Sequence, residues 1–293
     1  MSRFLLALRL TILTTCQTVV LAVILSITGV AHAATINNDL DCSHATNVID
    51  DGTYSGESVY VDGDSTEVCL VDGGIVGNDL SAEGSSTITM SGGSAYYLKA
   101  HGSSTVTISG GTVDYMEANA TATLRMSGGT VVNGLMGSGS STFAMSEGTI
   151  GGGIGFHDTA SFTLSGGSVY YISAMHTTTS TMTGGTVEDC LNAFGSSTVT
   201  MSGGTVGNCL SVGSFGTLIL LGSNFMVDGV PVPYGALGAI YSGILTGTLE
   251  SGDSLNNRFY QHENGSIRLV PEPSTALLLG FGLVGLGLRR RRV

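Results

Sequence analysis

Apolar and polar side chains alternate in short runs along most of the chain, and the runs recur at a nearly fixed spacing. Between residues 61 and 222, most runs place two apolar side chains one residue apart, often with Thr between them, and end in a turn of the type Ser-Gly-Gly. Alternation with a period of two is typical of a β-strand that buries one of its faces. The pattern therefore predicts many short strands.

The second glycine of each turn sets the period of the repeat. A fixed period near 20 residues is the sequence signature of a solenoid. We predict an all-β fold, a single parallel β-solenoid (β-helix) of about eight coils over residues 61–222. Irregular caps are expected over residues 34–60 and 223–269. The marker glycines, each 18 or 19 residues after the last, are Gly74, Gly93, Gly111, Gly129, Gly148, Gly167, Gly185, Gly204 and Gly222.

The residues around each marker glycine predict which side chains face inward. Apolar side chains stand five and three residues before it, as Ile88 and Met90 do. Another apolar pair follows the glycine and begins at +5 in 18-residue coils, as at Met116, and at +6 in 19-residue coils, as at Ile154. The extra residue is thus confined to one turn, so we expect the strands of successive coils to stay in register.

The two ends of the chain follow other patterns. Residues 1–33 carry Arg3 and Arg9, then an apolar run that ends in Ala31-His32-Ala33, which is typical of a cleaved secretory signal peptide. A retained membrane anchor is the alternative. Residues 270–293 begin with Pro271, Glu272 and Pro273, continue in an apolar run over 276–288, and end in Arg289, Arg290, Arg291 and Arg292.

The C-terminal apolar run is short for a membrane span. It has 13 residues, whereas crossing the hydrocarbon core takes about 20. The arginines that follow would stay on the cytoplasmic side. We expect a C-terminal helix that inserts transiently in the membrane until the chain is processed.

This order of motif, apolar helix and basic terminus closely resembles the PEP-CTERM sorting signal of Gram-negative bacteria. The resemblance covers residues 270–293 and implies processing by an exosortase, a membrane cysteine protease-transpeptidase. It also implies export across the inner membrane to the cell surface or extracellular matrix, in association with exopolysaccharide. Residues 243–259 resemble a segment that often precedes the signal in such proteins, and we expect them to close the stack with extra strands.

The charge of the chain excludes one class of partner. The sequence holds 22 acidic and 10 basic residues, a net charge of −12. Between residues 34 and 270 the bases are Lys99, Arg125, Arg258 and Arg268. Such an acidic body repels the phosphate backbone, so we expect no nucleic-acid partner.

The cysteines suggest disulfides in an exported protein. Cys190 and Cys209 both stand five residues after their marker glycine in successive coils. Stacked strands lie about 4.8 Å apart, which is within the Cα range that a disulfide accepts. We predict this bridge and, as a second candidate, Cys42 with Cys69 in the N-terminal cap. The alternative is four reduced thiols.

We predict no catalytic residue, metal site or cofactor. The best cluster is His157 and His176, at matching offsets in adjacent coils, with Asp158 beside them; polar turn residues are the simpler interpretation. The acids of residues 61–68 lack the remaining ligands of a calcium loop. A polysaccharide-active β-helix enzyme stays the alternative to a non-enzymatic surface or matrix structural protein.

Outward strand positions give the last candidates. Thr recurs there in two parallel rows, interrupted at Arg125 and Ala144, so an ice-binding or adhesive face is a further alternative. Tyrosines after the marker glycine could stack on sugar rings or pack at the corner. The outward Thr residues are Thr87, Thr89, Thr105, Thr107, Thr163, Thr179, Thr181, Thr198 and Thr200, and the tyrosines are Tyr96, Tyr97, Tyr115, Tyr170 and Tyr171.

Overall fold

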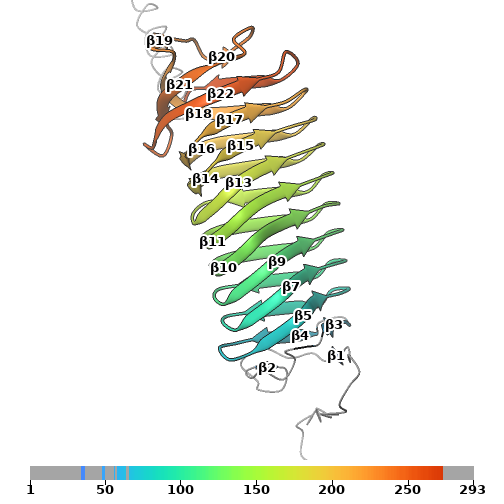
Figure 1. Cartoon of the computed structure of the whole chain (residues 1–293). Coiled ribbons are helices and arrows are strands. Elements are labelled where there is room, and N and C mark those ends of the chain that lie inside the picture. Colours follow the sequence, from blue (N-terminus) through green and yellow to red (C-terminus); the bar gives the residue numbers. More distant parts are fainter. Residues whose placement is uncertain (1–33, 37–47, 50–55, 57, 64–65, 273–293) are drawn as a thin grey trace, which may run out of the picture. The chain divides into compact units, whose positions relative to one another are not determined.

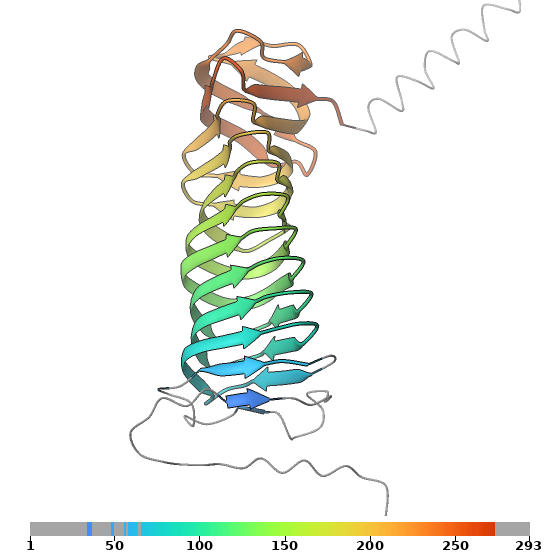
Figure 2. The same cartoon turned by 90° about the vertical axis from the view of Figure 1, so that its right-hand side faces the viewer.

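The computed structural model describes residues 34–36, 48–49, 56, 58–63 and 66–272, and every element of that part of the chain is a β-strand. The strands wind into a β-solenoid of about eight turns with coils of about 19 residues, stacked on one another along one axis (Figures 1 and 2). The predicted all-β solenoid is confirmed.

Each coil contributes strands to two faces of the stack. We call them the Thr face and the Tyr face after their outward side chains. The Thr face contains β4 (Glu67–Leu70), β6 (Thr87–Met90), β8 (Thr105–Ile108), the first parts of β10 (Thr123–Gly137) and β11 (Thr142–Phe156), β12 (Ser161–Leu164), β14 (Thr179–Val187), β16 (Thr198–Val206) and β18 (Thr217–Val227).

The Tyr face is built from the second half of each coil. It contains β3 (Val59–Val61), β5 (Ile75–Ala82), β7 (Ser94–Ala100), β9 (Thr112–Ala118), the later parts of β10 and β11, β13 (Ser168–Ala174), β15 (Cys190–Ala193) and β17 (Cys209–Val212). All of these strands pair in parallel with the next coil, so equivalent residues stack directly.

The space between the two faces is filled by the predicted inward rows. Ile88, Met90 and Ile154 are fully buried, and Met116 is 3% exposed. They belong to one hydrophobic cluster that runs through the stack. Because no coil buries its apolar side alone, each coil is stabilised by its neighbours.

The extra residue of the longer coils lies where the sequence predicts it. When β10 pairs with β9, the register shifts between Val131 and Gly134, and Leu135 then pairs with Met116. The same shift separates Ile150 from Gly153 where β11 pairs with β13. A β-bulge absorbs one residue without turning the following side chains over, so the inward rows stay continuous.

The marker glycines are required by backbone geometry. Gly111 has φ +85°, and a Cβ at this position would lie 2.4 Å from the carbonyl oxygen of Gly92 in the preceding coil. Only glycine combines this left-handed conformation with so close an approach of two backbones.

The parallel stack extends beyond residues 61–222 at both ends. β22 (Ser254–Gln261) continues the Tyr face beside β17, and β23 (Ser266–Val270) continues the Thr face beside β18. β21 (Ser242–Leu249) runs antiparallel between β18 and β22, and β19 (Val230–Pro231) and β20 (Gly235–Ala236) pair with β18 and β23. At the other end, β1 (Ala34–Ile36) and β2 (Val48–Ile49) pair with β3 and β4.

These end strands lack the Ser-Gly-Gly marker, so counting markers stops short of them. Their burial still alternates: in β22, Leu255, Asn257, Phe259 and Gln261 are buried and their neighbours exposed. In the part of the chain that the structure describes, no helix is long and apolar enough to cross a membrane. The predicted signal peptide and the apolar run 276–288 lie outside that part.

Candidate functional site

The Thr face presents a regular surface of hydroxyl groups. Thr87 pairs with Thr105, and Thr163 with Thr181, in outward rows that continue from coil to coil. Hydroxyls bond across coils, as Thr181 Oγ1 does to Thr163 Oγ1 at 3.2 Å. The second row is interrupted at Arg125 and Ala144, as the sequence predicts. This face offers hydroxyl groups and almost no charge.

The Tyr face carries a compact aromatic cluster near the N-terminal end of the stack. Tyr97 and Tyr115 occupy the same row in successive coils, and their rings stack with centroids 4.9 Å apart and planes at 18°. Tyr96 meets both rings edge-on, at 5.2 and 5.9 Å, and is 46% exposed. Aromatic rings prefer these geometries, so the cluster is held in place while one ring remains accessible.

An ion pair borders this cluster. Lys99 Nζ lies 2.7 Å from the Asp79 carboxylate and 5.1 Å from the centroid of the Tyr97 ring. The hydrogen bond to Asp79 raises the pKa of Lys99 above its usual value, although partial burial opposes the shift. The charge of Lys99 is therefore already balanced from within the chain.

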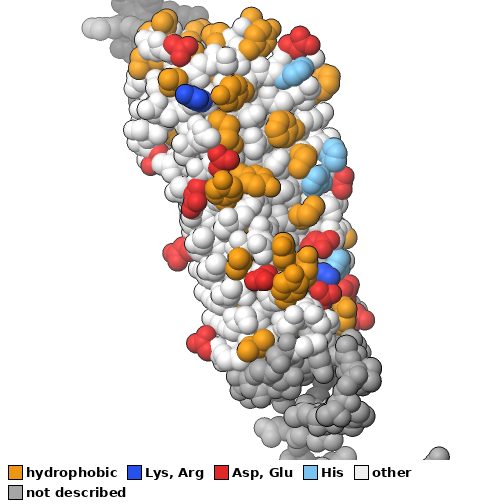
Figure 3. All heavy atoms as spheres, in the orientation of Figure 1, with side chains coloured by type: hydrophobic (Ala, Val, Ile, Leu, Met, Phe, Trp, Pro, Cys, Tyr) orange, Lys and Arg blue, Asp and Glu red, His pale blue; other side chains and the backbone are white. Residues whose placement is uncertain are grey.

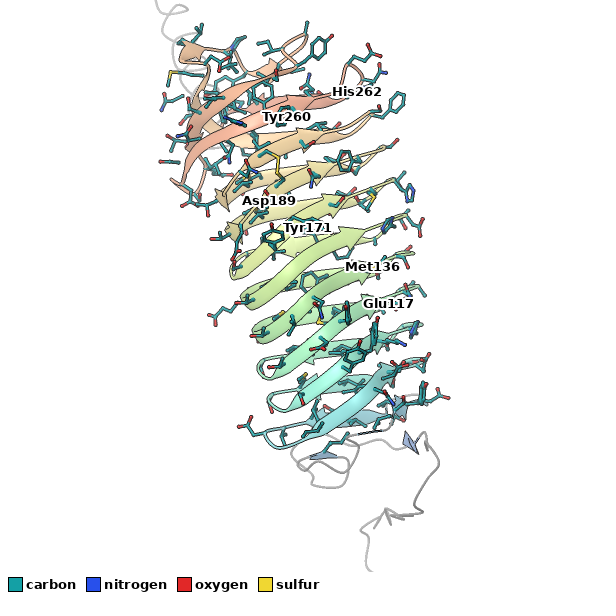
Figure 4. All side chains as sticks on the ribbon, in the orientation of Figure 1. Glu117, Met136, Tyr171, Asp189, Tyr260 and His262 are labelled. Carbon is teal, nitrogen blue, oxygen red and sulfur yellow. A yellow bond between two sulfur atoms is a disulfide. The ribbon has the colours of Figure 1, made fainter. Side chains whose placement is uncertain are left out.

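Farther along the same rows, glycines replace the side chains. Gly134 and Gly153 follow Tyr115 in its row, and Tyr171 comes next. The Tyr171 ring lies over Gly153, since a Cβ there would be 2.1 Å from the ring. Tyr171 is still 41% exposed, and Met136 is 60% exposed. Both are labelled in Figure 4, on the side of the stack that faces the viewer.

We define the aromatic stripe as the tyrosines of β7, β9 and β13 together with Met136 of β10. Figure 3 shows hydrophobic side chains in several groups along this side of the stack, with acidic side chains beside some of them. Tyr170 extends the stripe beside Tyr171, with ring centroids 6.2 Å apart. Its members are Tyr96, Tyr97, Tyr115, Met136, Tyr170 and Tyr171.

The sequence indicated these tyrosines but left their environment open. It did not reveal the Lys99–Asp79 pair or the packing of the Tyr171 ring on Gly153, because each contact joins residues from two coils. Both contacts could have been predicted by aligning successive coils with the coil period and allowing for the bulge. The bulge places Asp79 in the row of Tyr97, beside the row of Lys99.

The structure brings the predicted cysteine pair together on the Tyr face. Cys190 in β15 and Cys209 in β17 form a disulfide with Cα atoms 4.6 Å apart. Cys69 is also disulfide-bonded. Cys42, which we predicted as its partner, lies outside the described residues.

His157 and His176 share an offset from their marker glycines, but they do not lie in the same row of the stack. Phe156 pairs with Ala174. His157 comes one residue after Phe156, whereas His176 comes two residues after Ala174. The bulge in the longer coil causes this difference, which counting from the marker glycine conceals. His176 therefore faces Asp158: the Asp158 N–H donates to His176 Nδ1 at 3.2 Å, and a carboxylate oxygen lies 3.6 Å away.

This His–Asp contact lies in solvent, with side chains 62% and 59% exposed, and the His157 ring centroid is 5.6 Å from that of His176. Among the described residues no group of three or more His, Cys, Asp or Glu could hold a metal ion. In the acidic segment 61–68, Asp62 accepts a hydrogen bond from the Gly63 N–H, and Asp64 lies outside the described residues.

Comparison with known proteins identifies the C-terminus. Residues 269–292 match the PEP-CTERM protein-sorting motif. No curated protein and no solved structure matches the chain significantly. Of the predicted motif residues, Pro271 and Glu272 are described, whereas Pro273 and the four arginines lie outside the described part. The chain is thus a β-solenoid that carries a PEP-CTERM sorting motif, which implies processing by an exosortase and association with the cell envelope.

Proposed function

We propose that the protein is a non-enzymatic structural component of the cell surface or extracellular matrix and that its aromatic stripe binds an extracellular polysaccharide. The stripe is the observation that carries the proposal. Exposed apolar patches on a soluble fold mark interaction sites. Tyrosine combines an apolar ring with a polar hydroxyl, which suits the faces and hydroxyl edges of sugar rings.

The length of the stripe favours a polymer over a small ligand. Tyr97 and Tyr115 lie in successive coils, and Tyr171 lies three coils beyond Tyr115. At a coil spacing of about 4.8 Å, Tyr115 and Tyr171 are roughly 14 Å apart along the axis. Gly134, which follows Tyr115 in the row, carries no side chain, so a chain of sugars lying along the axis meets rings at both ends of the stripe without an obstacle between them.

The charges of the Tyr face favour a neutral polymer. Lys99 is paired with Asp79, and Glu117 and Asp189 lie on the same face (Figure 4). The whole chain has a net charge of −12, and such a surface repels a polymer of sugar acids. We therefore propose a neutral polysaccharide as the partner, consistent with the exopolysaccharide association that the sorting signal implies.

Affinity electrophoresis tests this proposal. The mature protein is run through gels that contain a neutral β-glucan or the polyanion alginate, and retardation by the neutral polymer is expected. The variant Tyr97→Ala/Tyr115→Ala/Tyr171→Ala should lose the retardation, while the matched control Thr107→Ala/Thr163→Ala/Thr181→Ala keeps it. Met136→Lys changes one highly exposed side chain and should weaken binding without affecting folding. Retardation by alginate alone, or its loss only in the Thr variant, would overturn the proposal.

The Thr face offers a second candidate, ice binding, because its outward Thr residues are stacked in regular rows over several coils. Arg125 and Ala144 limit the uninterrupted area. Thermal hysteresis that disappears in Thr107→Lys would support this function, and its absence in the wild-type protein would remove it.

A further inference from the structure

The last strand of the solenoid runs into the sorting motif without a linker. The matched motif begins at residue 269, whereas β23 extends from Ser266 to Val270. Leu269 is 1% exposed and belongs to the hydrophobic core. Pro271 follows Val270 directly, so the start of the motif is part of the folded stack.

Both edges of β23 are occupied near the motif. On one side β18 pairs with it in parallel, with Leu220 opposite Leu269 and Leu221 opposite Val270. On the other side β20 pairs antiparallel, with Gly235 opposite Leu269. An enzyme that binds its substrate as an added strand needs a free edge of backbone N–H and C=O groups. The folded end of the stack offers none at Leu269.

The acidic residue of the motif also contacts the stack. Glu272 Oε1 accepts a hydrogen bond of 3.4 Å from Ser223 Oγ on β18, and both Pro271 and Glu272 are only partly exposed. Glu272, one of the three residues that name the motif, thus contacts the end of the solenoid.

We propose that the folded end of the solenoid withholds the sorting motif from the exosortase, so that the enzyme acts on chains in which β23 is off the stack. Such chains exist before the last strand docks or during local opening. The strand over the outer edge, β20, has two residues, so only a short backbone pairing covers that edge. Cleavage is then coupled to the folding of this end of the protein, independently of what the stripe binds.

A disulfide lock tests this coupling. Ile219 and Arg268 are opposite each other on β18 and β23 and point outward. The native Cys190–Cys209 pair shows that outward residues on adjacent parallel strands can be bridged. The variant Ile219→Cys/Arg268→Cys ties β23 to the stack, and the matched control Thr200→Cys/Ile219→Cys ties β16 to β18 and leaves β23 free.

Processing is followed by pulse-chase labelling in a host that carries the exosortase. We expect the half-life of the uncut precursor to lengthen about tenfold or more in the locked variant and to stay at the wild-type value in the control. A tenfold smaller population of the open end corresponds to about 1.4 kcal/mol. Added reductant should restore cutting of the locked precursor. Processing of the locked chain at the wild-type rate would overturn the proposal.

A linker separates access from other effects of the lock. A flexible Gly-Ser segment inserted between Val270 and Pro271 moves Pro271, Glu272 and the rest of the motif away from the stack, while Leu269 and Val270 stay in β23. It should restore wild-type processing to the locked variant and accelerate processing of the unlocked chain. Failure of the linker to rescue the lock would show that the lock acts in another way, and this result would also overturn the proposal.

Discussion

The Thr face and the Tyr face are built from the same coils, yet they differ in how closely they follow the repeat. On the Thr face the outward rows hold Thr in most coils, as at Thr87, Thr105 and Thr123. On the Tyr face one outward row changes residue in nearly every coil, reading Tyr60, Ser81, Lys99, Glu117, Met136, Gly155, Ser173, Asn192, Ser211 and Tyr260.

The difference shows on which face the outward residues are explained by the fold alone. Thr is a favourable residue on any exposed strand, so the regular face needs no further cause. The repeat does not account for the stacked tyrosines, the Lys99–Asp79 pair or the position of the Tyr171 ring over Gly153. The bulges that absorb the extra residue also precede the Tyr face. Variation is concentrated on that face, which is why we place the binding function there.

The largest expected effect tests whether the two faces share one core. Leu124 on the Thr face and Leu98 on the Tyr face are both fully buried. Replacing either by Ala should lower the free energy of unfolding by about 2–5 kcal/mol, whereas Thr107→Ala should change it by no more than about 0.5 kcal/mol. Urea denaturation measures all three. A cost at Leu98 far below that at Leu124 would mean that the Tyr face is only loosely attached.

The next effect concerns the disulfide of the Tyr face. Cys190 and Cys209 are separated by 19 residues, and closing a loop of this length stabilises a protein by about 3 kcal/mol. Cys190→Ser/Cys209→Ser should therefore shift the urea midpoint downward under non-reducing conditions. The outward Thr198→Ser/Thr217→Ser pair on the Thr face is the control. An unchanged midpoint in the cysteine variant would mean that the disulfide does not stabilise the protein.

Much of this architecture follows from the sequence, because equivalent residues of successive repeats are expected to stack on one another. The inward rows, the marker glycines and the site of the inserted residue were all predicted from spacing. The end strands were not, because β22 and β23 keep alternation but lose the Ser-Gly-Gly turn. Counting from the marker placed Asp158 beside the two histidines but did not show that His176 is its partner, because that count ignores the bulge.

The chemistry of the Tyr face was harder to predict than its fold. Exposed tyrosines can be found by counting along a coil, but their partners come from the coils before and after. Lys99 reads as an isolated base in the sequence, and only the stacked rows bring Asp79 to it. The position of the Tyr171 ring depends on the absence of a side chain at Gly153 in the neighbouring coil, and the sequence of one coil does not reveal this contact.

A smaller effect should appear at high pH. Because the pKa of Lys99 is raised in the folded state, the stabilisation that it provides is fully present below its unfolded pKa of 10.5 and is lost as pH rises through the folded value. For a pair this close to solvent we expect about 0.5–1 kcal/mol. Lys99→Met and Asp79→Asn should each lower the urea midpoint at neutral pH.

The control for this prediction is the pH dependence itself. Above the raised pKa, wild-type protein and Lys99→Met should converge in the Lys99-dependent part of their stability. A constant difference between them across the alkaline range would assign the effect to the packing of the lysine stem on Tyr97 instead of to its charge.

The smallest expected effect is on catalysis. His157→Ala/His176→Ala should leave the chain length of the host polysaccharide unchanged, because we propose that the solenoid binds the polymer without cutting it. Size-exclusion chromatography of the polymer after incubation with either protein measures this. Shortening by the wild-type protein that the double variant loses would restore the enzyme hypothesis.

The most direct test of the account is tyrosine emission during a titration with neutral polysaccharide. The chain contains 10 Tyr and no Trp, so its intrinsic fluorescence reports on the tyrosines, five of which form the stripe. We expect a saturable change in emission that persists in Thr107→Ala/Thr163→Ala/Thr181→Ala and disappears in Tyr97→Ala/Tyr115→Ala/Tyr171→Ala. Retention of the protein by the polymer with unchanged tyrosine emission would place the polymer on another face and contradict it.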